Sequence, residues 1–502
     1  MSFLAGASRS ETLREIGLRV TLALFPCAVL ALHLRPVLGV RPGLWLVPLV
    51  MGFGNAFLVV SVGRQLLRGR RFLVFWALYG LIWAAVAWHG THFHRAPRPA
   101  ALFMNLGEIS EVPWPGWEEV PWVIVLVALG LGWLARRPVP IGRETRLATA
   151  GALGLCALLQ GYAVLHYQTR DMVRFSQYRD LVRTHGLEAA VILDGLQTFR
   201  LGRGASALAV LRRDKQDNPA TPLPVDPVRV DRMVVVQVES LDREALTPAI
   251  APALTAVWQT TTRGLVVSQR SSVSGSSSAD FQLLTGLRPL SGIPVYRLAW
   301  DGSPETFPGR ASARGFRFHA YHGNDPNFWN RGPFFAAIGV DFQTSESIPE
   351  TEHSRWGRTD GDLLRYVAGR VHEQRAVHFV ITLSTHPPFD LVHPPGPMDD
   401  VRMKERYLAS MRYADDALGK FVGDLPRDGN TLLVLYGDHP SGVFEPPGSE
   451  EPPVPMMLGV LTPDGRVTPL TRAGRPVQDL PGTYELPGLH QFLLSCLDAS
   501  AR

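Results

Sequence analysis

Residues 432–439 read LLVLYGDH, an apolar run that ends directly in a carboxylate and an imidazole. The run MVVVQV at Met233–Val238 has the same form and ends in Glu239 and Ser240. Short continuous apolar runs of this kind are typical of strands that helices cover on both faces. Ligand groups of such sheets gather beyond the carboxyl ends of the strands. We therefore expect the polar residues after these two runs to lie at one edge of a sheet.

Three further runs repeat the pattern, so that hydroxyl or imidazole groups follow each candidate strand. They are Leu265–Val267 before the serine-rich turn Ser271–Ser278, Phe316–Ala320 before Tyr321-His322-Gly323-Asn324, and His378–Leu383 before Ser384-Thr385-His386. From residue 231 onward, β-branched runs alternate with helix-like segments. This alternation predicts an α/β domain over 231–502, with a largely parallel central sheet flanked by helices.

The first third of the chain is different, because it is apolar with basic residues between the apolar runs. About five runs have the length of a membrane span: Leu18–Leu34, Gly43–Val62, Phe72–Trp88, Pro121–Ala135 and Leu147–His166. We predict an α-helical transmembrane module over 1–167.

The charges of the loops predict the orientation of this module. Basic residues follow two of the runs: Arg64, Arg68, Arg70 and Arg71 follow the second, and Arg136, Arg137, Arg143 and Arg146 follow the fourth. The loop between the third and fourth runs is acidic and contains Glu108, Glu111, Glu118 and Glu119. Positive loops stay in the cytoplasm. Five crossings then place residues after about 168 on the extracytoplasmic side of the inner or plasma membrane, whereas an even number would keep them in the cytoplasm.

Residues 168–230 are expected to form an extracytoplasmic connector that includes the proline-rich stretch Asn218–Pro227. The net charge of +5 comes mostly from the short loops of the membrane module. Without a basic face interleaved with aromatic residues, nucleic acid is not an expected partner. The three cysteines have no spacing of a thiolate metal site or a disulfide framework.

The residue types at the strand ends suit a hard divalent cation. Glu239, Asp438 and His439 are predicted protein ligands, and a serine hydroxyl would complete the set. Oxygen and nitrogen donors accept Mn²⁺, Mg²⁺ or Zn²⁺, and a cation beside a hydroxyl helps to make it a nucleophile at neutral pH. Asp360, which precedes a helix-like segment, is expected to cap that helix and not to bind metal.

Five motifs stand in order between residues 322 and 439. They are His322-Gly323-Asn324-Asp325-Pro326-Asn327-Phe328-Trp329-Asn330-Arg331, Gly339-Val340-Asp341, Trp356-Gly357 with Asp360, His386-Pro387-Pro388-Phe389, and Tyr436-Gly437-Asp438-His439. Together these motifs resemble the lipoteichoic acid synthases, a family of phosphoglycerol transferases in the alkaline phosphatase/sulfatase superfamily. The resemblance covers roughly residues 231–460. The resemblance implies a sulfatase-like catalytic domain behind a membrane module.

The resemblance also implies a reaction. A hydroxyl attacks the phosphate of phosphatidylglycerol, and the glycerol phosphate passes to a glycan or polyol-phosphate acceptor of the cell envelope, with one divalent ion, typically Mn²⁺. Anchoring the turn on Asp280-Phe281 makes Ser276 the nucleophile and fourth metal ligand, and a slip of one residue would choose Ser277. By position, His386 contacts the reacting phosphate, and the head group is held by His322, Trp329 and Arg331.

Three alternatives remain open. A hydrolase of the same fold, a phosphodiesterase or sulfatase, is disfavoured in its sulfatase form, because the turn lacks the proline and arginine of a formylglycine sequence. A phosphoethanolamine transferase would share the metal site. A membrane-tethered sensor of lipid head groups without catalysis would require a lost ligand or nucleophile, and neither loss is visible in the sequence.

Overall fold

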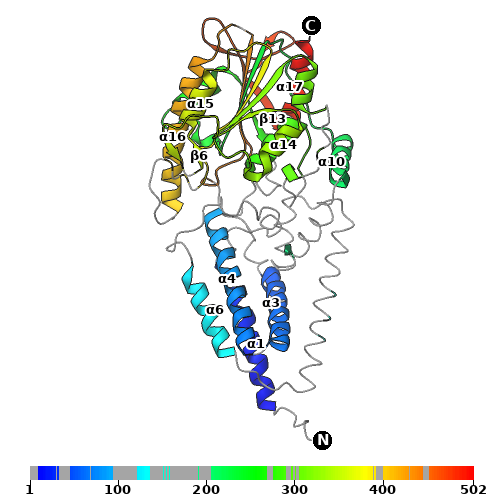
Figure 1. Ribbon diagram of the computed structural model, residues 1–502, viewed down its shortest axis with the longest axis vertical. Helices are drawn as coiled ribbons and strands as arrows, with labels where there is room; N and C mark the ends of the chain where they lie inside the picture. The colour runs from blue at the N-terminus through cyan, green and yellow to red at the C-terminus, as the bar shows by residue number, and fades with distance from the viewer. Residues whose placement is uncertain are drawn as a thin grey trace. The chain divides into compact units, whose positions relative to one another are not determined.

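The computed structural model describes most of the catalytic region and part of the N-terminal region. The described residues are 9–29, 31–32, 46–67, 69–93, 121–135, 151, 154, 158, 190–191, 205–267, 275–289, 295–297, 300, 305–354, 356–387, 389, 391, 400–428, 430–444 and 452–501. Those up to 191 belong to one compact unit, and those from 205 onward belong to a second (Figure 1). Each unit is described by itself.

Four helices make up most of the described part of the N-terminal unit. They are α1 (Arg9–Val29), α3 (Leu46–Leu66), α4 (Arg70–Phe93) and α6 (Trp122–Ala135). Helix α1 packs on α3, and α4 packs on α6. Phe72, Trp76, Tyr79 and Trp83 recur at three- and four-residue spacing on α4 and are buried in the core of this unit. The same spacing places them on one face of the helix.

Among the residues that the structure describes, one helix segment is both long and apolar enough to cross a membrane, Arg70–Ala87. It coincides with the third predicted span. Trp122–Ala135 is apolar but shorter. The fifth predicted span, Leu147–His166, lies almost entirely outside the described residues. The multi-pass module and its orientation therefore stay a prediction.

A buried ionic cluster ties three of these helices together. Arg64 donates from Nε and Nη2 to the two carboxylate oxygens of Glu15, each at 2.6 Å, and Arg19 donates to the same carboxylate at 3.0 Å. Arg64 also donates to the carbonyl of Ala135 at the end of α6. Arg64, one of the basic residues behind the predicted orientation, is thus neutralised within the protein.

The second unit is built on a mixed sheet. Its strands are β1 (Arg232–Val238), β2 (Thr262–Val267), β3 (Arg317–His322), β4 (Asp341–Gln343), β7 (Ala376–Ile381), β8 (Thr431–Gly437), β9 (Val454–Leu461), β10 (Val467–Pro469) and β13 (Asp479–Glu485). Their order is β13-β2-β9-β8-β1-β7-β3-β4, with β10 on β9. The strands from β8 to β4 are parallel, as predicted, whereas β9 runs antiparallel to β8 and β2.

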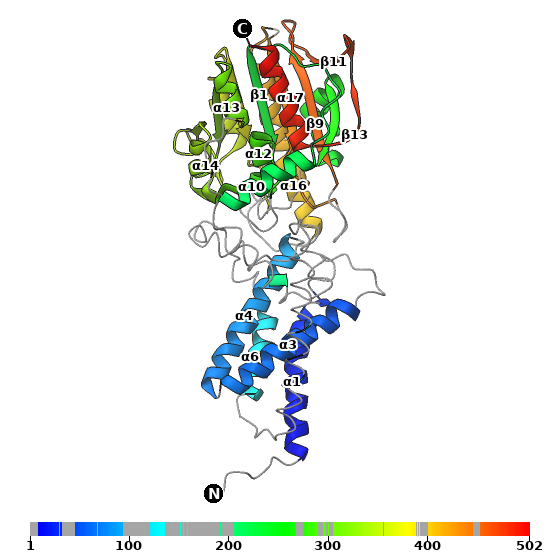
Figure 2. The ribbon, with the colours of Figure 1, turned by 90° about the vertical axis from the view of Figure 1, so that its right-hand side faces the viewer.

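Helices cover both faces of this sheet (Figures 1 and 2). On one face lie α11 (Pro252–Thr260), α15 (Asp360–Ala368) and α16 (Asp400–Asp424); on the other lie α12 (Gly275–Thr285), α13 (Phe307–Ala313) and α17 (Leu486–Ala499). Every residue of β1, β7 and β8 is buried, which explains their unbroken apolar runs.

Shorter elements lie between these strands and helices along the chain. They are η4 (Arg243–Ala245), η5 (Val295–Arg297), η6 (Phe328–Asn330), α14 (Arg331–Ala337), β5 (His353–Ser354), β6 (Gly357–Arg358), β11 (Thr471–Arg472) and β12 (Arg475–Pro476). Strand β5 pairs only with β6 among the described strands, and the two form a small antiparallel hairpin.

Part of the predicted connector packs on the catalytic unit. Helix α10 (Ala205–Asp217) presents Asp214 to Arg288, which also donates to Glu485 of β13 at 2.5 Å. Lys215 donates to the carbonyl of Thr285, the last residue of α12, at 3.4 Å. A cation at that position complements the negative end of a helix dipole. The described residues 205–230 therefore belong to the same compact unit as the sheet.

Candidate active site

The register of the parallel strands brings Glu239 and Asp438 together. Val238 of β1 is paired with Gly437 of β8. Glu239 directly follows the first of these residues and Asp438 directly follows the second. Both strands end at the same edge because they are parallel. Glu239 is 2 % exposed and Asp438 is fully buried. The neighbouring strand runs thus explain why two acidic side chains meet inside the protein.

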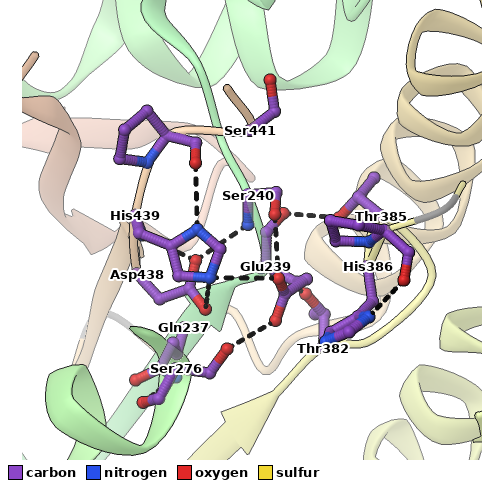
Figure 3. Close-up of polar contacts among 12 residues, drawn as sticks. Gln237, Glu239, Ser240, Ser276, Thr382, Thr385, His386, Asp438, His439 and Ser441 are labelled. Carbon is purple, nitrogen blue, oxygen red and sulfur yellow. Dashed lines mark hydrogen bonds and ion pairs between the residues drawn. The ribbon is translucent and has the colours of Figure 1, made fainter. Parts of the chain in front are cut away.

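His439 completes a cluster of possible metal ligands (Figure 3). One ligand atom from each of Glu239, Asp438 and His439 lies within 4.8 Å of the others. The His439 Nε2 is 3.4 Å from Glu239 Oε1 and 3.6 Å from Asp438 Oδ2. Its Nδ1 lies 3.0 Å from the carbonyl of Pro440, to which it can donate. That bond would leave Nε2 unprotonated and turned toward the carboxylates, as metal-binding histidines require.

The electrostatics of this cluster suit a divalent cation. Asp438 Oδ2 is buried and has no hydrogen-bond partner among the described residues. Burial raises the pKa of Glu239, and burial together with the Glu239 charge raises the pKa of Asp438 well above its usual range. Two buried carboxylates therefore resist ionising together unless a positive charge joins them. The donor set fits Mn²⁺, Mg²⁺ or Zn²⁺.

Ser276 lies against this cluster. It is the second residue of α12, and its hydroxyl donates to Glu239 Oε2 at 2.8 Å. The Gln237 amide of β1 donates to the Ser276 carbonyl at 3.2 Å. A Cβ on Gly275 would lie 2.2 Å from the His439 ring, so glycine permits the close approach of the two segments. Ser277, the alternative nucleophile, is 4 % exposed.

Ser240 contacts both carboxylates through its amide and its hydroxyl, and its carbonyl is held by Tyr407. Its amide donates to Asp438 Oδ1 at 2.8 Å, and its hydroxyl donates to Glu239 Oε1 at 2.8 Å. Its carbonyl accepts from the Tyr407 hydroxyl at 2.9 Å. Ser240 has a φ of 52°, a left-handed conformation that costs a residue other than glycine about 1 kcal/mol or more. The surrounding hydrogen bonds stabilise this strained turn at the metal ligands.

His322 and Arg331 lie close enough to interact electrostatically. His322 ends β3, and its Nδ1 lies 3.0 Å from the carbonyl of Ile381. Burial and the Arg331 charge hold the pKa of His322 well below its usual range, so the ring is neutral. Arg331 is 4 % exposed and donates from Nε to Asp280 of α12 at 3.2 Å. The sequence did not indicate this partner for the guanidinium.

The other predicted site residues fall in three different situations. Figure 3 shows the His386 ring beside Glu239, on the side away from His439. The Trp329 side chain lies outside the described part of the chain, although its backbone belongs to η6. The helix cap predicted at Asp360 was wrong. Thr359 is the N-cap of α15 and accepts from the Asp362 amide, whereas Asp360 accepts from the amides of Leu383 and Ser384.

Sequence reasoning missed a set of residues that support the ligands. Gln237 holds Ser276, Thr382 accepts from the Glu239 amide, Thr385 donates to the Glu239 carbonyl, and Tyr407 holds Ser240. Two of these residues left a signal, because Gln237 is a polar residue within a run of valines and Thr385 follows a candidate strand. The others lie in loops or on a distant helix, where the local pattern does not indicate their partners.

The family model called Sulfatase matches residues 232–486, about half of the chain. The chain therefore belongs to the sulfatase family, within the alkaline phosphatase superfamily. The matched range begins with β1 and ends at the start of α17, so it contains all the ligand residues described above. This membership confirms the superfamily that the sequence motifs indicated.

The chain is similar in sequence to curated lipoteichoic acid synthases. Lipoteichoic acid synthase 2 of Bacillus subtilis is 27% identical over 177 residues, which are 33% of this chain and 27% of that relative. The match thus spans about a quarter of the relative's length.

Two solved structures are similar as well. The lipoteichoic acid synthase LtaP from Listeria monocytogenes has 16% identity and a TM-score of 0.43, covering 58% of this chain and 78% of LtaP. The lipooligosaccharide phosphoethanolamine transferase EptA from Neisseria meningitidis has 14% identity and a TM-score of 0.49, covering 88% of each chain.

Proposed function

We propose that this protein is a membrane-anchored, metal-dependent phosphoglycerol transferase. It moves glycerol phosphate from a phosphatidylglycerol-type lipid to a glycan or polymer acceptor of the cell envelope. The contact between the Ser276 hydroxyl and Glu239, within the cluster that includes Asp438 and His439, carries the proposal. Family membership and the similarity to lipoteichoic acid synthases support it.

The chemistry proceeds in two displacements. Ser276 Oγ forms a bond to phosphorus, the bond from phosphorus to the diacylglycerol oxygen breaks, and diacylglycerol leaves with a proton in place of the one lost by Ser276. An acceptor hydroxyl then bonds to phosphorus, Ser276 Oγ leaves, and the serine regains a proton from the acceptor. Glu239 orients the serine hydroxyl before the first step, because it accepts the hydroxyl's hydrogen bond.

The remaining residues bind and orient the phosphorylated head group. Glu239, Asp438, His439 and Ser276 would hold the divalent ion. When bound, that ion supplies positive charge that stabilises anionic phosphate oxygens and the serine alkoxide. His386 contacts the reacting phosphate, and Arg331 contributes the fixed positive charge beside the Asp280 carboxylate. His322 and Trp329 complete the head-group site.

The location follows from the charge pattern of the N-terminal region. We propose a multi-pass protein of the inner or plasma membrane, with about five spans over 1–167 and the catalytic domain outside the cytoplasm. Residues 168–230 connect the two. Helix α4 contains the described segment that is long and apolar enough to cross the membrane. A lipid donor and an extracytoplasmic glycan acceptor both suit this placement.

The test follows the fate of a labelled lipid head group. Full-length protein in detergent with Mn²⁺ is incubated with phosphatidylglycerol labelled in its terminal glycerol, and both the loss of label from the lipid and the release of diacylglycerol are measured. Ser276→Ala should lower the rate by about 10³-fold or more, because it removes the nucleophile. Mass spectrometry of the wild-type protein without acceptor should find a glycerophosphoryl group on Ser276.

Ser277→Ala is the matched control, because it removes the neighbouring hydroxyl from the same helix. It should keep most of the activity. Full activity of Ser276→Ala, or loss of activity only in Ser277→Ala, would overturn the assignment of the nucleophile. Turnover of phosphatidylethanolamine in place of phosphatidylglycerol would favour the phosphoethanolamine reaction, and release of free glycerol phosphate with acceptor present would favour a hydrolase.

A further inference from the structure

The segment from β5 to the start of α15, residues 353–360, touches two parts of the proposed head-group site. It contains the β5–β6 hairpin, whose strands pair His353 with Arg358 and Ser354 with Gly357. None of its residues belongs to the set proposed to hold the metal or the substrate. Three separate contacts nevertheless connect it to the loop of His386 and to the residue after His322.

The first contact is an aromatic one. The Trp356 ring lies against the His386 ring, with 4.2 Å between ring centroids and 54° between the planes. Phe328 meets Trp356 edge-on at 6.2 Å. The His386 Nδ1 lies 2.7 Å from the Pro387 carbonyl, which holds the imidazole from its other edge. Packing against the indole and this polar contact together restrict the His386 ring to one orientation.

The second contact fixes the backbone that carries His386. The Asp360 carboxylate accepts from the amides of Leu383 at 2.7 Å and Ser384 at 3.1 Å, and the Ser384 hydroxyl accepts from the Asp360 amide at 2.8 Å. Burial raises the pKa of Asp360 to about 6, which leaves the carboxylate ionised at neutral pH. An ionised carboxylate offers both oxygens as acceptors, and this geometry uses both.

The same loop is also anchored on the metal side of the site. The Glu239 amide donates to the Thr382 hydroxyl at 2.9 Å, and the Thr385 hydroxyl donates to the Glu239 carbonyl. Residues 382–386 therefore bridge Glu239 and Asp360. A displacement of the Asp360 end of this loop would move His386 relative to the metal ligands.

The third contact holds the backbone next to His322. The Arg358 amide donates to the Gly323 carbonyl at 2.8 Å. Gly357 has a φ of 123°, and a Cβ there would lie 2.3 Å from the Gly323 oxygen. Only glycine allows this approach, because no other residue both adopts that φ without strain and leaves the space free. The hairpin thus reaches the His386 loop and the end of β3 at once.

We propose that Trp356 and Asp360 are positioning residues that hold His386 in a fixed place relative to His322 and the metal ligands. The inference deepens the proposed function, on which it rests for the role of His386 in the reaction. A preorganised site loses about 10²-fold in rate when a reacting group moves by about 1 Å. Both residues would act through His386 and would not touch the reacting atoms themselves.

Nuclear magnetic resonance of the histidine rings tests the placement directly. Full-length, metal-free protein is labelled with ¹³C at histidine Cε1, and the His386 signal is assigned by its loss in His386→Gln. Trp356→Leu should move the His386 signal, because the ring current of the indole disappears. Trp356→Phe should restore part of the shift. Trp258→Leu is the control, because that half-buried tryptophan lies on α11 and stacks with Arg243 instead.

Asp360→Asn tests the second contact with a side chain of the same shape. An amide has one acceptor oxygen, so one of the two bonds to the loop is lost. Hydrogen exchange at the Leu383 and Ser384 amides should become about 10-fold faster or more, since local opening becomes easier. This measurement keeps the inference testable if Trp356→Leu fails to fold.

Kinetics then separate positioning from folding. Trp356→Leu should lower kcat for diacylglycerol release by about 10–100-fold, with Mn²⁺ affinity unchanged and activity restored by Trp356→Phe. An unmoved His386 signal together with unchanged exchange at Leu383 and Ser384 would overturn the inference. The magnetic resonance and exchange readouts need no substrate. If phosphatidylglycerol is not turned over at all, the proposed function fails while these two measurements still decide the placement.

Discussion

The metal side and the head-group side of the proposed site balance their charges differently. On the Glu239–Asp438 side, two buried carboxylates face the imidazole of His439, which can be neutral. Asp438 Oδ2 has no hydrogen-bond partner among the described residues. On the Arg331 side, the buried guanidinium is already paired with Asp280, and the nearby His322 is held neutral. The Glu239–Asp438 side therefore carries excess negative charge whenever both carboxylates are ionised, whereas the Arg331 side is balanced within the protein.

This difference indicates what each side can bind. Excess buried negative charge calls for a cation, because an unpaired buried charge is costly. A balanced side can bind an anionic phosphate only if Arg331 keeps Asp280 and offers further donors to the ligand. The guanidinium has five N–H donors, so it can serve both partners, whereas a lysine ammonium is a single point charge.

The largest effect is expected from a substitution that removes the excess negative charge. Asp438→Asn should abolish the stabilisation by Mn²⁺, which for a site filled at 100 times its Kd is about 2.7 kcal/mol. In chelator, however, the variant should unfold at the same temperature as the wild type or higher, because it relieves the repulsion with Glu239. Thermal unfolding with and without Mn²⁺ measures both effects.

Asp416→Asn, an exposed carboxylate of α16 paired with Lys420, is the control and should leave the Mn²⁺ effect intact. If Asp438→Asn lost equal stability with Mn²⁺ and with chelator, the carboxylate would be a structural group, and the contrast between the two sides would disappear.

An intermediate effect is expected on the balanced side. Arg331→Lys should raise the KM for phosphatidylglycerol by about 10-fold, because the ammonium cannot hold Asp280 and a phosphate oxygen in the same geometry. Its Mn²⁺ affinity should stay close to that of the wild type. Asp280→Asn, which removes the internal partner and keeps the guanidinium, should leave KM unchanged or lower it. A normal KM in Arg331→Lys would mean that Arg331 serves Asp280 alone.

The smallest effect is expected from substitutions of Ser240, which contacts both carboxylates. Ser240→Ala and Ser240→Gly both remove the hydroxyl that donates to Glu239, so each should weaken Mn²⁺ binding by about 10-fold, the low end for a partner of a metal ligand. Calorimetric titration measures this. The glycine variant should be about 1 kcal/mol more stable than the alanine variant, since glycine adopts the φ of 52° without strain. Equal Mn²⁺ affinity in all three proteins would show that the hydroxyl has no part in ligand alignment.

The contacts that hold the site residues in place could not be predicted from the sequence. Asp280 and Arg331 are 51 positions apart, and nothing in the pattern of either segment indicates that they pair. Packing between distant segments also decides three other features: the tilted contact of Trp356 with His386, the left-handed backbone of Ser240 and the hydrogen bonds from the Leu383 and Ser384 amides to Asp360. The antiparallel course of β9 was missed for the same reason, since a buried run has no marker of its direction.

The sequence by itself determined the strand runs, the superfamily and the residues at which the strands end. Parallel neighbours end at a common edge, so the meeting of Glu239, Asp438 and His439 follows from the order of apolar runs and polar residues along the chain. Only the tertiary structure decided which of the buried charges are balanced within the protein. Charge balance depends on side-chain distances across the fold, which local periodicity does not encode.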